Sequence, residues 1–292
     1  MLKKSFLFLF TLLTFLALYH MGAFDAIPDF PPVQELFIKS EKNVFFCDSK
    51  FSFAVTGDMR WSHEPQVAIH KDIASRSPLF VINLGDVVRW AKTSLYDSYI
   101  CHLKPFLKDQ VRYFHTPGKH SHEHEIYRFV PEVFSSYFGR SFYYIDVNDD
   151  WRFIVLDSSS LALPDKQLEW LENIVMDAQR NKREVAILSH CPPHFLEKGI
   201  THSLDGASSA KLIEYFKQFS VAAYFAAHIH TNTAFMCNKT PVYITALNHS
   251  TWQTEPAGYY FVEVSERKLK VISVQIEKGG QIKEKQFEIK SS

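Results

Sequence analysis

Residues 79–86 read Leu-Phe-Val-Ile-Asn-Leu-Gly-Asp, an apolar run that ends in a glycine and the carboxylate of Asp86. A short run of Val, Ile, Leu and Phe closed by Gly is typical of a buried β-strand. The same pattern occurs at residues 51–58, Phe-Ser-Phe-Ala-Val-Thr-Gly-Asp, which end at Asp58. Because open α/β sheets present their chemistry where strands end, the two carboxylates are predicted to converge on one point.

Strands and helices alternate along the chain around these two stretches. Apolar runs predict further strands at residues 111–116, 142–147, 151–157, 184–189 and 221–227, and helical spacing predicts helices at 65–75, 94–107, 164–180 and 208–219. Residues 258–264 and 269–276 alternate between apolar and polar side chains, which is typical of antiparallel strands. This order predicts an α/β fold.

The composition indicates a globular protein with one domain that is large enough to be an enzyme. The 292 residues are 46% hydrophobic and include 26 Phe, which is enough to form a substantial core. Lys and Arg total 32, as do Asp and Glu, so the formal charge is zero. This balance offers no electrostatic footprint for nucleic acid, and no nucleic-acid partner is expected. The oligomeric state stays open.

The N-terminal residues 1–24 are predicted to be a signal peptide or an N-terminal membrane anchor. Lys3 and Lys4 precede an apolar run that, extended to residue 24, approaches the roughly 18 to 20 residues that a membrane span needs. No clean small-x-small cleavage site follows, which favours the anchor. The two lysines then keep the N-terminus in the cytoplasm and place the rest on the extracytoplasmic side, periplasmic or secreted. Residues 25–43 form a Pro-containing spacer, and the domain spans 44–292.

Several other predicted strands also end in side chains that can bind a metal ion. These are His120, His190, His228 and His230. Asp and His together, without a Cys-x-x-Cys motif, suit a hard or borderline divalent cation. If the strand continues regularly, His228 and His230 point to the same side. Each motif alone has a simpler interpretation: Gly-Asp could be only a turn, and His190 could be a core residue. The ordered set is far more specific than any one of its members.

This ordered set resembles the calcineurin-like metallophosphoesterases. The family pattern is Gly-Asp-x-His, Gly-Asp, Gly-Asn-His, a His before a Pro-rich turn, and Gly-His-x-His. Here the motifs stand as Gly57-Asp-Met-Arg60, Gly85-Asp86, Gly118-Lys-His120, His190-Cys-Pro-Pro193 and Ala227-His-Ile-His230. The resemblance covers residues 51–276 and implies a two-sheet β-sandwich flanked by helices, the four-layer metallophosphoesterase fold, with antiparallel strands at its C-terminal end.

The resemblance also implies an activity and a cofactor. It implies hydrolysis of a phosphomonoester or phosphodiester by a metal-activated hydroxide, with one or two divalent ions such as Mn, Fe or Zn. The implied roles are a bridge between two metals for Asp86, ligands of the first metal for Asp58 and His230, ligands of the second for His190 and His228, and leaving-group stabilisation for His120. The substrate is then a phosphorylated small molecule or a lipid-linked phosphate, and an anchored protein favours one near the membrane.

Two positions depart from the family pattern. Arg60 stands where a His ligand is usual, and Lys119 stands where an Asn ligand is usual; as charged side chains neither can coordinate a cation. The positively charged side chains of Arg60 and Lys119 could instead bind phosphate oxygens. Alternatively, His63 or His122 could supply the missing ligands. As a third alternative, catalysis could be lost. The alternative function is therefore a catalytically impaired domain that binds a phosphate ligand or acts as a scaffold.

The cysteines leave two alternatives open. The four residues Cys47, Cys101, Cys191 and Cys237 could form disulfides in three connectivities outside the cytoplasm. Cys191, next to His190, could be a soft metal ligand or a buried apolar residue, and the second is the more common situation.

Overall fold

The computed structural model of the protein describes residues 43–59, 63–106, 111–119, 131–193, 203–245, 256–277 and 280–287. The predicted segment 1–24 and residues 25–42 of the predicted spacer lie outside these ranges, so the anchor and its boundaries stay predictions. Within these ranges, no helix is both long and apolar enough to span a bilayer.

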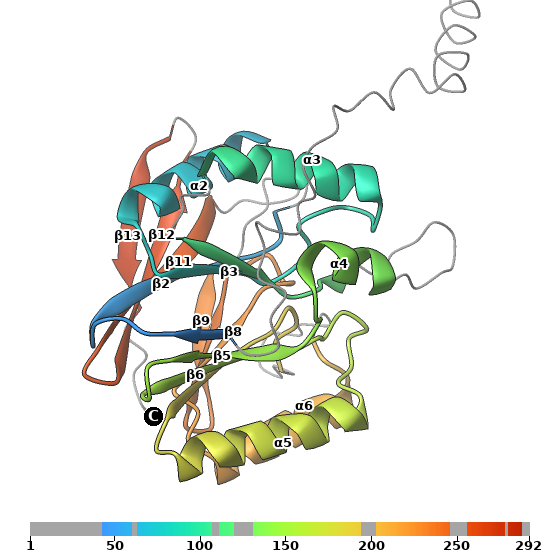
Figure 1. Ribbon diagram of the computed structural model, residues 1–292, viewed down its shortest axis with the longest axis vertical. Helices are drawn as coiled ribbons and strands as arrows, with labels where there is room; N and C mark the ends of the chain where they lie inside the picture. Colours follow the sequence, from blue (N-terminus) through green and yellow to red (C-terminus); the bar gives the residue numbers. More distant parts are fainter. Residues whose placement is uncertain are drawn as a thin grey trace, which may run out of the picture. The chain divides into compact units, whose positions relative to one another are not determined.

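The strands that the structure describes form two mixed β-sheets (Figure 1). The seven-stranded sheet contains, in spatial order, β1 (Asn43–Phe45), β5 (Tyr143–Val147), β6 (Trp151–Val155), β7 (Glu184–Leu188), β8 (Ala223–Ala226), β10 (Thr240–Ile244) and β9 (Thr233–Cys237). The six-stranded sheet contains β13 (Ile282–Gln286), β12 (Lys268–Ile276), β11 (Ala257–Ser265), β2 (Phe51–Thr56), β3 (Phe80–Asn83) and β4 (Arg112–His115). Strands β2, β3 and β4 run parallel in one sheet, as do β6, β7 and β8 in the other.

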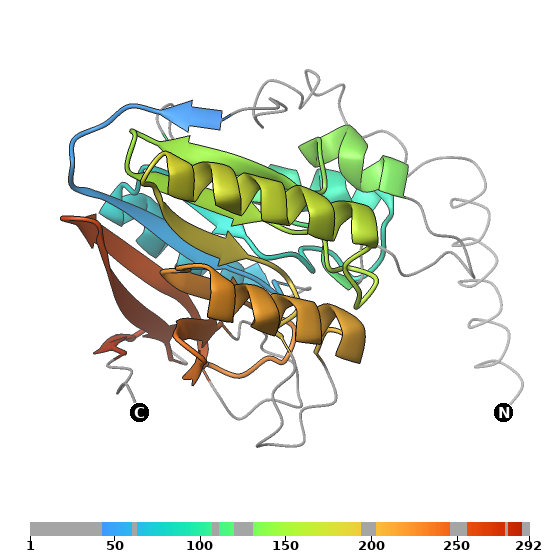
Figure 2. The same ribbon diagram turned by 90° about the horizontal axis from the view of Figure 1, so that it is seen from below.

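Helices cover the outer faces of both sheets. On the six-stranded sheet, α2 (His63–Arg76) packs against β11 and β12 and contacts α3 (Thr93–Leu103), which continues into a 3₁₀ turn (Lys104–Phe106). On the other sheet, α5 (Asp165–Arg180) and α6 (Gly206–Gln218) lie side by side (Figures 1 and 2) and bury Leu171, Val175, Leu212 and Phe216 against it. The layers therefore run helix, sheet, sheet, helix, and the predicted four-layer α/β sandwich is confirmed.

Local sequence explains where the two helices on the seven-stranded sheet begin. Pro164, with φ −58°, directly precedes α5, because a proline can take a first-turn position without losing a hydrogen bond. Leu171 and Val175, four residues apart, then fall on one buried stripe. The Asp205 carboxylate accepts a hydrogen bond of 2.7 Å from the Ser208 N–H and so caps the first turn of α6.

Aromatic side chains fill the space between the two sheets. The fully buried Phe53 ring on β2 stacks on Phe80 of β3 at 5.2 Å between centroids. It also meets two rings of the other sheet edge-on, Phe153 of β6 at 4.9 Å and Phe225 of β8 at 6.0 Å. Each such pair adds about 0.5–1.5 kcal/mol to the stabilisation from burial alone. This packing holds the sheets together, so that loops leaving one sheet face loops leaving the other.

Of the elements that differ from the predicted ones, two have a clear local cause. The eight-residue helix α4 (Pro131–Phe138) is not among the predicted helices, because it is too short for a clear apolar period. Strand β9 was also not predicted, because all of its five residues are half-buried and the strand lacks an alternating pattern.

Candidate metal centre

The loops that carry the predicted ligands meet between the two sheets. Two of them follow β2 and β3 of the six-stranded sheet, and two follow β7 and β8 of the seven-stranded sheet. The His228 N–H donates to Asp58 Oδ2 at 2.6 Å and so joins one set to the other. The Thr116 hydroxyl, after β4, donates to the Leu156 carbonyl, after β6, at 2.6 Å and so also joins the two sheets. The predicted convergence of strand ends is therefore present in the structure.

Asp58 and Asp86 lie side by side at the bottom of this region. Both are fully buried, and both have φ 52°, in the left-handed region that costs most residues about 1 kcal/mol or more. The Asp58 N–H donates to the Gly85 carbonyl at 3.0 Å, which joins the two loops. Buried carboxylates are costly unless a proton or a cation compensates them. The pair therefore favours a positive charge in this place.

Gly118 lets a third loop approach the two carboxylates closely. A Cβ atom at this position would lie 2.2 Å from both the backbone nitrogen and Oδ1 of Asp86. Only a glycine allows this approach. The glycine of the predicted Gly118-Lys-His120 motif therefore has a steric role, apart from any role of the side chains that follow it.

His190 presents one ring nitrogen to the carboxylates. Its Nδ1 lies 2.8 Å from the Leu84 carbonyl, which can only accept, so Nδ1 carries the proton. In the neutral ring Nε2 then has a lone pair, and it lies 3.5 Å from Asp86 Oδ2 and 3.1 Å from His228 Nδ1. A backbone carbonyl that fixes the tautomer of a histidine is a common second contact of metal-binding histidines.

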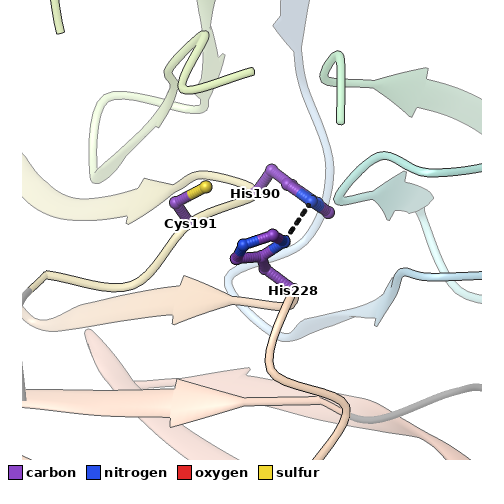
Figure 3. A group of neighbouring side chains, drawn as sticks. All are labelled: His190, Cys191 and His228. Carbon is purple, nitrogen blue, oxygen red and sulfur yellow. Dashed lines mark hydrogen bonds between the residues drawn. The ribbon is translucent and has the colours of Figure 1, made fainter. Parts of the chain in front are cut away.

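His228 and His230 reach the site from a loop and not from a strand. Strand β8 ends at Ala226, and both histidines have positive φ, 69° and 54°. The regular strand on which the predicted common orientation of the two histidines depends is therefore not present. His228 points toward His190 (Figure 3), and His230 Nε2 lies 3.3 Å from Asp58 Oδ1. The loop thus places one imidazole beside His190 and the other beside Asp58.

The donor set fits a divalent cation. Single ligand atoms from the buried residues Asp58, Asp86 and His190 all lie within 4.8 Å of one another. Carboxylate oxygens and imidazole nitrogens suit manganese, iron or zinc. Four of the predicted ligands, Asp58, Asp86, His228 and His230, also have the left-handed backbone, and such strained residues gather at functional sites.

Cys191 lies next to this donor set. Its Sγ falls within 4.8 Å of ligand atoms of His190 and His228 (Figure 3), and the thiol donates to the Ser158 carbonyl at 3.4 Å. Burial raises the pKa of the thiol to about 12, so the sulfur is protonated at neutral pH. None of the four cysteines forms a disulfide; all four lie in the described ranges.

Of the three remaining predicted site residues, one lies in the described part of the chain. Lys119 is half-buried and directly follows Gly118, whose backbone closely approaches Asp86. Arg60 and His120 lie outside the described residues, as do His122 and the side chain of His63. Which group occupies the two altered ligand positions therefore stays a prediction.

One set of contacts at the site was missed in the sequence. The Ser158 hydroxyl, three residues after β6 ends, accepts hydrogen bonds from the Ser189 hydroxyl at 2.8 Å and from the Cys191 N–H at 2.9 Å. These contacts hold the backbone on both sides of His190. The sequence contains a signal for these contacts, because the apolar run at residues 151–157 is followed by polar side chains, as at the other predicted site loops.

Parts of the chain are similar in sequence or in fold to known proteins. Residues that make up 24% of the chain are 35% identical over 74 residues to the Bos taurus cyclic GMP-AMP phosphodiesterase SMPDL3A, and the match spans 16% of that relative's length. The fold resembles a dimetal phosphatase from Danio rerio, with TM-score 0.61 and 14% identity, covering 76% of this chain and 95% of that one. It also resembles the purple acid phosphatase PPD1 of yellow lupin, with TM-score 0.60 and 14% identity, covering 80% and 52%.

At 14% identity the two solved structures support the fold alone. The family model for calcineurin-like phosphoesterases, however, matches residues 51–232, which is more than half of the chain and includes all five predicted ligands discussed above. The chain therefore belongs to the calcineurin-like phosphoesterase family.

Proposed function

We propose that this protein hydrolyses phosphate esters, either monoesters or diesters, with one or two divalent cations in the site between the two sheets. The observation that carries the proposal is the buried cluster of Asp58, Asp86 and His190, whose ligand atoms lie within 4.8 Å of one another. A donor set of this kind, on a chain of this family, suits the binding of a cation next to a phosphate group.

The distances support a division of the ligands into two groups. Asp58 and His230, 3.3 Å apart, would hold one cation, and His190 and His228, 3.1 Å apart, would hold the other. Asp86, whose Oδ2 lies 3.5 Å from His190 and whose loop is bonded to that of Asp58, would bridge them. Bound divalent cations lower the pKa of water and neutralise charge on the phosphate.

The side chains at the two altered positions would act on the substrate directly. Lys119 and Arg60 would donate to phosphate oxygens and supply positive charge. His120 would protonate or stabilise the leaving group. Lys119 is half-buried and directly follows Gly118, which approaches Asp86 closely, and this supports a position at the edge of the site. Positioning and charge are most of what phosphoryl transfer requires.

The SMPDL3A relative bears on the class of substrate. The SMPDL3A relative is named as a cyclic GMP-AMP phosphodiesterase, and the shared stretch is 74 residues long. We therefore place phosphodiesters beside phosphomonoesters as the substrates to test first. If residues 1–24 anchor the protein on the extracytoplasmic side, a lipid-linked phosphate is the third, and alkaline extraction of membranes tests that location.

The activity test compares an aryl phosphate with an aryl phosphodiester in the presence of manganese. Asp86→Ala is expected to lose both turnover and bound metal. Asp177→Ala is the matched control, because Asp177 lies on the outer helix α5, where its carboxylate pairs with Arg152 at 2.7 Å. Absence of metal and of turnover in the wild-type protein, on both substrates, refutes the proposal.

The second candidate function is binding of a phosphate ligand without hydrolysis. Lys119 favours it, because an ammonium at a ligand position disfavours a cation there by charge repulsion. Under this alternative the wild-type protein binds inorganic phosphate, Lys119→Ala weakens that binding, and Asp86→Ala does not change turnover because there is none. Lys119→Asn should raise metal occupancy if the lysine displaces a cation.

A further inference from the structure

Asn83 contacts both loops that carry the buried carboxylates. It is the last residue of β3 and is 1% exposed. Its Oδ1 accepts from the Gly85 N–H at 3.0 Å, directly before Asp86. Its Nδ2 donates to Thr56 Oγ1 at 3.1 Å and lies 3.2 Å from Met59 Sδ. Thr56 and Met59 stand on either side of the Gly57-Asp58 pair, so this side chain joins the two loops.

An amide suits this place because it donates and accepts at once. A carboxylate cannot donate, and an alkyl group can do neither. The Thr56 hydroxyl contacts Met59 Sδ at 3.7 Å, and the Met59 carbonyl accepts from the Gln66 side chain of α2. The buried contacts of Asn83 thus continue to a helix on the outer face of the sheet.

We infer that Asn83 is a positioning residue that sets the separation of Asp58 and Asp86, and through it the affinity of the site for divalent cations. This inference rests on the proposed function. Both carboxylates sit on left-handed backbone with φ 52°, a conformation that persists only where the surroundings enforce it. Without the amide the loops can relax, and the two carboxylates move apart. Loss of such an outer contact typically weakens metal binding by about 10- to 100-fold.

The test compares Asn83→Leu with Asn148→Leu in the full-length chain. Asn148, in the turn between β5 and β6, also joins two segments through its amide, because its Oδ1 accepts from the Cys47 N–H at 2.9 Å and its Nδ2 lies 3.8 Å from Cys47 Sγ. That turn lies at the N-terminal end of β6, whereas the predicted ligands of this sheet follow the C-terminal ends of β7 and β8, which run parallel to β6. Both variants therefore remove an amide and its contacts between two segments, but only Asn83→Leu affects the carboxylates.

Two measurements separate positioning from general destabilisation. In a manganese titration by calorimetry, Asn83→Leu should bind about 10- to 100-fold more weakly than the wild type, and Asn148→Leu should bind as the wild type does. In hydrogen exchange without metal, Asn83→Leu should lose protection at residues 56–59 and 84–86, and Asn148→Leu at residues 47 and 148–150.

Each outcome decides the inference. Wild-type manganese affinity and wild-type exchange in folded Asn83→Leu overturn it, as does an equal loss of affinity in Asn148→Leu. If the wild-type protein binds no manganese, the proposed function fails, and exchange at the two loops alone decides whether Asn83 positions them. If Asn83→Leu does not fold, Thr56→Val removes one partner of the amide at constant size, and the same pattern with a smaller loss is expected.

Discussion

Replacing Gly118 by alanine should displace Asp86 without removing any polar group. The new Cβ would lie 2.2 Å from the backbone nitrogen and from Oδ1 of Asp86, and 2.8 Å from its Cγ. Ordinary contacts of a Cβ start at 3.4 Å, so one loop must retreat by about 1 Å. The atoms in the way belong to the backbone and to a fully buried side chain, and neither can rotate aside.

A displacement of this size has a known order of magnitude. Misplacing a catalytic group by about 1 Å can lower a rate by about 100-fold, and overpacking a closely packed site costs about 1–3 kcal/mol of unfolding free energy. Gly118→Ala should therefore lower turnover of an aryl phosphate or phosphodiester by about two orders of magnitude and weaken manganese binding. Steady-state kinetics, calorimetry and urea denaturation measure the three effects.

Gly206→Ala is the matched control for this substitution. Gly206 begins α6, and a Cβ there meets no atom within 4 Å. The alanine should leave turnover unchanged and raise stability by up to about 1 kcal/mol, because glycine is a poor helix former. A folded Gly118→Ala variant with wild-type turnover and wild-type manganese affinity would refute the steric reasoning.

Three further predictions concern pH, packing and thiol chemistry. Burial lowers the pKa of His70 and of His115 to about 3, so both rings stay neutral when folded, while the unfolded chain protonates them below about pH 6.5. Their contribution to the free energy of unfolding should be constant above about pH 7 and fall by about 1.4 kcal/mol per pH unit for each ring as the pH drops from 6.5 toward 3. Urea denaturation at several pH values measures this, and a His115→Phe variant with an unchanged pH dependence would contradict it. Phe153→Ala removes a fully buried ring between the sheets and should cost about 3–5 kcal/mol of unfolding free energy, and a loss below about 1 kcal/mol would show that the core collapses around the gap. The exposed Cys101 should react with a thiol reagent in the folded protein, whereas the buried Cys191 should react only on unfolding, and equal rates would argue against its burial.

The strands and helices at the centre of the fold are predictable because each has the same pattern of burial along its whole length. Strand β3 is buried at all four positions, so its sequence is a continuous apolar run. The stripe on α5 likewise repeats over several turns. Strand β9 has no such signal in its own side chains, because antiparallel pairing with β10 holds it in the sheet.

The candidate site is predictable in identity but not in geometry. The sequence places Asp58, Asp86, His190 and the two histidines of the β8 loop after strands, and the structure brings them together. The sequence does not reveal that His228 and His230 have left-handed backbone conformations, because these depend on tertiary contacts such as the hydrogen bond from the His228 N–H to Asp58. Nor does it reveal the carbonyl of Leu84 beside His190, since every residue has a carbonyl.

The position of the site between two sheets also bears on how the protein is made. The His228 N–H and the Asp58 carboxylate that it contacts are separated by 170 residues. A growing chain therefore exposes its two carboxylates long before the imidazoles of the β8 loop are synthesised, and a tight cation site can form only after both sheets have packed. A cation that binds only the folded protein then stabilises it by mass action. Acquisition of metal in a cell would thus mark the last step of folding, and a chain stopped before residue 228 would lack it.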